Sequence, residues 1–230
     1  MPILDLPGRR LGAPARRLGT SGARPVIAGR RPRTAGIRPL ARRAPWAASA
    51  YVAAVQSGAY ALRPLPEADR EAVLREHSTN VDNLRAGRWH TLLTSAFLVE
   101  EPLDPAYGAI LLGVLGGAEA VWGSRRTAAV FAFGHLGASL LVYGGLRATD
   151  ASKETRSAVD VGASYGLNAV LGAAAVSLPH RAARAVAAAG VLGLVVRPLV
   201  REGRTFTDVG HLAALLLGLG AGHTGAFTRG

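Results

Sequence analysis

A serine and a histidine lie at similar positions near the start of two apolar segments. Ser164 follows Asp160 by four residues in the stretch DVGASYG, and His211 follows Asp208 by three residues in the stretch TDVGHLAALLLG. If both segments are helices that enter a membrane from the same side, both side chains lie about 5 Å below the helix ends. An imidazole can remove the proton of a neighbouring hydroxyl, and backbone N–H groups at a helix start can stabilise an oxyanion. The pair therefore predicts nucleophilic catalysis, and the alternative is a packing serine with a hydrogen-bonded interhelical histidine.

Small residues recur at four-residue spacing in both segments. Gly162 and Gly166 do so around the serine, and Ala214, Gly218 and Gly222 do so after the histidine. Small residues at this spacing let membrane helices approach each other closely. We therefore expect the two segments to pack against each other.

The composition indicates a membrane protein. The 230 residues are 49% hydrophobic with a mean hydropathy of +0.22, and the apolar residues gather in segments. A helix needs about 20 residues to cross the hydrocarbon core. We expect an all-α membrane protein with a transmembrane domain of six helices over residues 44–228. The expected spans cover residues 44–62, 105–124, 127–146, 161–179, 182–200 and 209–228. The fifth is the weakest, because only twelve residues separate Arg184 from Arg197.

The charges predict how the chain is oriented. Residues 1–43 contain eleven arginines and the single acid Asp5, and this composition predicts a disordered tail attracted to anionic lipids rather than to nucleic acid. With both termini in the cytoplasm, the tail, the inner turns and the C-terminus hold 16 of the 27 basic residues, and the outer connections hold 13 of the 15 acids. Basic residues favour the cytoplasmic side. We expect an integral protein of a bacterial plasma membrane.

Several kinds of chemistry have no support in the sequence. The chain contains no cysteine, so disulfides and thiolate metal sites are excluded. It also has no glycine-rich phosphate loop and no histidine-rich metal spacing. We expect neither a metal nor a cofactor.

Four ordered motifs between Gly87 and Gly222 resemble those of the rhomboid intramembrane serine proteases. They are GRWHTLLTSAFL at 87–98, GGAEAVWGSRR at 116–126, the Gly-x-Ser motif at 162–164, and the histidine followed by small residues from 211. The resemblance implies a six-helix bundle with a water-accessible cavity, in which Ser164 is the nucleophile and His211 the general base. The substrate would be a membrane segment of another protein. Glu119 and Gly123 would be structural, with Glu119 paired to Arg125 or Arg126.

The chain departs from this family at positions near the site. Active members carry a histidine and an asparagine on the second span that hold the oxyanion, and VEEPLDPAYGAI at 99–110 contains neither. Tyr165 follows the serine where a small residue is usual, and Asn168 stands where an aromatic residue would stack on the histidine. Gly162, Tyr165 and Asn168 are therefore candidates for supporting the oxyanion.

Two further hypotheses come from these observations. The first is a catalytically inactive member that binds transmembrane helices of client proteins. The second is a small transporter or channel that uses His135, an ionisable residue near the middle of the third span.

Overall fold

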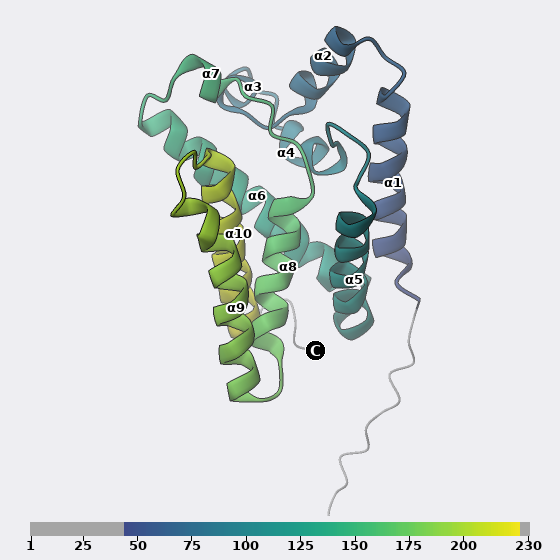
Figure 1. The fold of residues 1–230 in the computed structure, drawn as a ribbon, viewed down its shortest axis with the longest axis vertical. Helices are drawn as coiled ribbons and strands as arrows, with labels where there is room; N and C mark the ends of the chain where they lie inside the picture. The colour runs from purple at the N-terminus through teal and green to yellow at the C-terminus, as the bar shows by residue number, and fades with distance from the viewer. Residues whose placement is uncertain (1–43, 226–230) are drawn as a thin grey trace, which may run out of the picture. The chain divides into compact units, whose positions relative to one another are not determined.

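The site-bearing helix α8 (Ser164–Ser177) lies among the other long helices in the computed structural model, which describes residues 44–225. Eight of its 14 residues are buried, because it contacts α5 (Pro105–Trp122), α6 (Ser124–Ala148), α9 (Arg181–Leu199) and α10 (Phe206–Thr224). Figure 1 shows α8 between α5 on one side and α9 and α10 on the other. The first helix, α1 (Trp46–Leu62), packs against α5.

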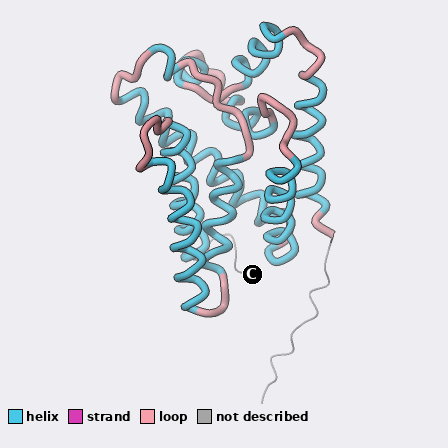
Figure 2. Tube along the Cα trace, in the orientation of Figure 1, coloured by secondary structure: helices cyan, strands magenta, loops and turns pink. Residues whose placement is uncertain are grey.

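Short elements connect α1 to α5. They are α2 (Glu67–His77), α3 (Val81–Arg85), α4 (Thr91–Thr94) and the 3-10 helix η1 (Ser95–Phe97), and α7 (Lys153–Arg156) lies between α6 and α8. Helices and loops make up residues 44–225, without a strand (Figure 2). Buried asparagines hold the first connection in place. The Asn80 side chain accepts a hydrogen bond from the Asn83 backbone N–H at 2.8 Å, and Asn83 Nδ2 donates to the Ser78 carbonyl at 2.7 Å.

Helices lie over all six apolar segments, and three of them meet the length and hydropathy expected of a membrane span. These are α5, α6 and α9. The apolar stretch of α9 has no buried residue, and Val186 and Leu194 are 72% and 71% exposed. A helix that exposes large apolar side chains in this way is stable against lipid rather than water. The structure therefore agrees with a membrane protein, and the predicted tail at 1–43 and the end of the sixth segment at 226–228 lie outside the described residues.

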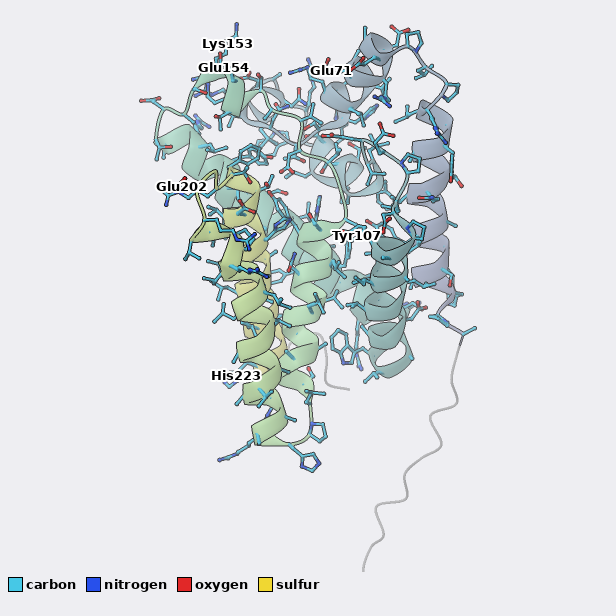
Figure 3. All side chains as sticks on the ribbon, in the orientation of Figure 1. Glu71, Tyr107, Lys153, Glu154, Glu202 and His223 are labelled. Carbon is cyan, nitrogen blue, oxygen red and sulfur yellow. The ribbon has the colours of Figure 1, made fainter. Side chains whose placement is uncertain are left out.

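The two ends of the helices carry different groups. Figure 3 places Glu71, Lys153, Glu154 and Glu202 toward one end and His223 toward the other. The short turn between α8 and α9 lies at the end opposite α7 (Figure 1). The helices α8 and α9 therefore run in opposite directions, as a short turn between neighbouring helices requires.

Glu119 has different partners from those the sequence predicts. Its carboxylate accepts hydrogen bonds from Ala47 N at 3.1 Å, Ala48 N at 2.8 Å and Ser124 Oγ at 2.6 Å. The expected ion pair with Arg125 or Arg126 was wrong, because the Glu119 side chain is buried and turned toward the first turn of α1, whose N–H groups have no acceptor within the helix. Gly123 ends α5 with φ of 83°, a backbone conformation that favours glycine.

Candidate active site

Ser164 and His211 face each other between α8 and α10. His211 Nε2 lies 2.9 Å from Ser164 Oγ, within hydrogen-bond distance, and both side chains are half-buried. Ser164 is the first residue of α8, and its N-cap, Ala163, has no side-chain group that could bond to the first-turn N–H groups. The hydroxyl thus lies beside both an imidazole and a helix start. This arrangement permits proton transfer from serine to histidine, with backbone donors close to the nucleophile.

The start of α10 is held by a capping box that places His211 on its second turn. The Asp208 carboxylate accepts from Thr205 N at 2.8 Å and from Thr205 Oγ1 at 3.0 Å, and the reciprocal bond from the Asp208 backbone is also present. Such a pair satisfies donors that a helix start otherwise leaves without partners. Asp208 therefore serves the helix end, and its bonds are made to Thr205 rather than to the histidine.

Small residues let α8 and α10 approach at backbone distance. A Cβ on Gly218 would lie 2.0 Å from the Ala169 carbonyl oxygen, and a Cβ on Gly222 would lie 2.6 Å from the Ala173 carbonyl oxygen. Ala214 is fully buried in this contact. Gly166 lies instead against α6, where its Cβ would meet the Phe131 ring at 2.3 Å. Gly172 also lies in the contact between α8 and α10, since a Cβ there would lie 2.5 Å from the Leu215 carbonyl oxygen. It could not be found from the sequence, because it does not follow Gly166 at the four-residue spacing of the other small residues.

The residues considered for the oxyanion make other contacts. The Gly162 N–H donates to the Ser95 carbonyl at 2.7 Å, and Asn168 Nδ2 donates to the Ser164 carbonyl at 2.9 Å. Gly162 has φ of 132°, which explains why glycine stands in the bend before α8. The N–H groups of the first turn of α8 have no acceptor in the helix, because the first bond of that turn is donated by Leu167 to Ala163. They are the donors closest in sequence to Ser164.

Tyr165 contacts both the histidine and a buried carboxylate. Its ring lies edge-on to the His211 ring, with centroids 5.4 Å apart and planes at 76°. Its hydroxyl donates to Asp160 Oδ2 at 3.1 Å, and Tyr143 donates to the same oxygen. Burial raises the pKa of the Asp160 carboxyl above its ordinary value, and the two tyrosine hydrogen bonds oppose that shift. In the sequence pattern Asp160 serves only to mark the start of a helix, although a carboxylate beside an apolar run is itself a signal of a functional or anchoring role.

His135 belongs to a second polar cluster, and its ring lies 6.1 Å from the Tyr165 ring between centroids. Its Nε2 lies 3.1 Å from Ser95 Oγ, and Ser95 Oγ lies 2.8 Å from Thr79 Oγ1. The ring also stacks on Phe131 at a centroid distance of 6.3 Å. His135 borders a largely apolar cavity of about 260 Å³ between α1, η1, α5 and α6, which neither Ser164 nor His211 lines. A transport role for His135 stays a prediction.

The site described so far is a serine and a histidine at the junction of two closely packed helices, in a helical protein with membrane-compatible spans. Within residues 44–225, no group of three or more potential ligands is placed to hold a metal ion. These features define a helical membrane protein with a serine–histidine pair as its candidate reactive centre.

Comparison with known families identifies this class more closely. Residues 40–225 match the family described as rhomboid-like protein, which is most of the 230-residue chain. The chain belongs to this family. Comparisons with curated proteins and with solved structures gave no match.

Proposed function

We propose that the protein is an intramembrane serine endopeptidase that cleaves membrane segments of other proteins. The observation that carries the proposal is the 2.9 Å distance between Ser164 Oγ and His211 Nε2. This is the distance at which a histidine can act as general base for a serine. The family and the apolar helices supply the membrane setting. Six spans, cytoplasmic termini, a bacterial plasma membrane and an Arg-rich tail on anionic lipid are further parts of the proposal.

The reaction has two stages. Ser164 Oγ attacks the peptide carbonyl carbon while its proton passes to His211 Nε2, and the carbonyl oxygen becomes an oxyanion. The first-turn N–H groups of α8, which have no acceptor within the helix, are the donors we propose for that oxygen. The C–N bond then breaks, and His211 returns the proton to the leaving amine. In the second stage, water deprotonated by His211 attacks the acyl-enzyme and releases the acid and the serine.

A second function is favoured by a specific observation. The segment before and at the start of α5 lacks the histidine and asparagine that hold the oxyanion in active members of the family the sequence resembles. Removing one oxyanion donor slows an enzyme by roughly 10² to 10³. A member without catalysis would bind client transmembrane helices without cleaving them. Its client binding would not depend on the Ser164 hydroxyl.

The two functions differ in what Ser164→Ala does. A fluorophosphonate probe is attacked by an activated serine oxygen, which displaces fluoride from phosphorus, so the protease proposal expects labelling that Ser164→Ala abolishes and His211→Ala strongly reduces. Ser95→Ala is the matched control, because it removes a serine that also lies near a histidine but belongs to the other polar cluster. Labelling that survives in both site variants contradicts the protease proposal. Client helices that co-purify equally with wild type and Ser164→Ala, without labelling, support the binding function.

A further inference from the structure

Tyr165 is held from two sides beside the histidine. Its ring packs with fully buried Ala138 and Ala214, and the absence of a side chain at Gly210 makes room for it, since a Cβ there would lie 2.3 Å from the ring. Its hydroxyl is fixed by Asp160 Oδ2 at 3.1 Å. The Tyr165 side chain is 3% exposed, so it has little freedom to turn away.

The carboxylate that fixes Tyr165 is itself anchored. Tyr143 on α6 donates to the same Oδ2 atom as Tyr165. The Asp160 backbone N–H donates to Ser78 Oγ at 2.7 Å, which ties the residue to the connection between α1 and α5. Asp160 therefore connects the segment before α8 to α6 and to the connection between α1 and α5. Tyr165, bound to Asp160, in turn contacts His211 on α10.

The aromatic contact to His211 comes from an unexpected position. Asn168, where the family resemblance predicts an aromatic side chain, turns back to bond its own helix at the Ser164 carbonyl. Tyr165 offers its ring edge to His211 instead, at a centroid distance of 5.4 Å. Edge-to-face pairs of this kind are favourable and directional. The described structure gives the imidazole no carboxylate hydrogen bond that would orient it.

We propose that Tyr165, locked by Asp160 and Tyr143, is the positioning residue that holds the His211 imidazole toward Ser164. Tyr165 touches the base and not the reacting carbonyl, so its role is orientation. The expected effect on reaction rate rests on the proposed function. The expected effect on the orientation of His211 rests on the side-chain contacts alone. A misplacement of about 1 Å at a reacting pair can lower a rate by about 100-fold.

The test compares first-order labelling constants of a fluorophosphonate probe at saturation. Tyr165→Ala removes the ring and is expected to lower the constant by about 100-fold. Tyr165→Phe keeps the ring but loses the bond to Asp160, and is expected to lower the constant by about tenfold or less, the equivalent of one hydrogen bond. Asp160→Asn keeps an oxygen that accepts from both tyrosines and should restore most of the rate that Asp160→Leu loses.

Two readouts separate positioning from folding. A variant that merely unfolds labels a smaller fraction of molecules at the wild-type constant, whereas a positioning defect labels the full fraction at a lower constant. Tyr143→Phe is the matched control. It removes the second hydroxyl that donates to Asp160 but leaves Tyr165, whose ring contacts His211, unchanged. It should lower the constant less than Tyr165→Phe does. Full labelling of Tyr165→Ala at the wild-type constant overturns the inference and leaves the proposed function intact.

A structural measurement tests the inference even in an inactive protein. If wild type is not labelled at all, the proposed function fails, but the orientation of His211 can still be measured. An experimental structure of Tyr165→Ala is expected to show His211 Nε2 beyond hydrogen-bond distance from Ser164 Oγ. A separation that stays near 2.9 Å in that variant overturns the inference.

Discussion

Single polar residues hold this fold at places where a helix end would otherwise be unsatisfied. Glu119 accepts two backbone N–H groups at the start of α1 and the Ser124 hydroxyl after α5, so one carboxylate joins three segments. The structural role of Glu119 could be predicted from the sequence, since a lone acid near a helix end needs a partner. The identity of that partner could not be predicted, because Arg125 and Arg126 are nearer in sequence. Ala47 and Ala48 reach Glu119 only through the packing of α1 on α5.

Glu119→Leu should destabilise the protein without changing its chemistry. The substitution leaves the Ala47 and Ala48 N–H groups without their acceptor, at a cost of about 1–3 kcal/mol for the buried Ala48 group and less for the half-buried Ala47 group. The measurement is the thermal unfolding midpoint in detergent. Glu101→Leu is the control, because Glu101 is 65% exposed in its ion pair with Arg70, and such surface pairs contribute about 0–1 kcal/mol. An equal fall of the midpoint in both variants would refute the capping role of Glu119.

The helices α8 and α10 position the site because their backbones lie in direct contact. Spacing alone predicts the shared depth of Ser164 and His211 and the small residues Gly218 and Gly222, since both follow from the helical rise and period. The rotation of each helix about its axis is set by packing that the sequence pattern does not reveal. Gly166 therefore faces α6 rather than α10, and Tyr165 rather than residue 168 meets His211.

Gly218→Ala should separate α8 from α10. The added Cβ would stand 2.0 Å from the Ala169 carbonyl oxygen, so one backbone must move. Overpacking of this kind costs about 1–3 kcal/mol, and the measurement is again the unfolding midpoint. Gly193→Ala in α9 is the matched control, because a Cβ there meets nothing within 4 Å, and alanine is the better helix former by about 1 kcal/mol. The idea of close packing fails if Gly218→Ala is as stable as Gly193→Ala.

At the scale of the whole molecule, charge and hydropathy predict the membrane topology, which is the number and orientation of the spans. Three helices meet the length and hydropathy of a span, whereas α8 has only 14 residues and is largely buried among its neighbours. A helix of that length extends about 21 Å, less than the hydrocarbon thickness of about 30 Å. The sequence predicts a longer fourth span because the apolar run begins before the helix does, in the bend at Gly162.

The membrane topology is directly measurable because the sequence contains no cysteine, so that an introduced cysteine is the single thiol to be labelled. Single cysteines introduced at exposed Lys153, Glu202 and His180 can be treated with a membrane-impermeant maleimide on intact cells. Six spans with cytoplasmic termini predict labelling of Lys153→Cys and Glu202→Cys from outside, and labelling of His180→Cys only after the membrane is permeabilised. Labelling of His180→Cys on intact cells would reverse or break this topology.

The measurement that tests the central claim most directly is the location of the fluorophosphonate adduct by mass spectrometry of the purified wild-type protein. The account predicts one phosphonate per molecule on the peptide that contains Ser164, with no adduct on Ser164→Ala and slow formation on His211→Ala. It also predicts that the peptide containing Ser95 stays unmodified, although Ser95 lies 3.1 Å from His135. An adduct on any residue other than Ser164, or no adduct under conditions where the protein is folded, would contradict the proposal that Ser164 and His211 form a catalytic pair.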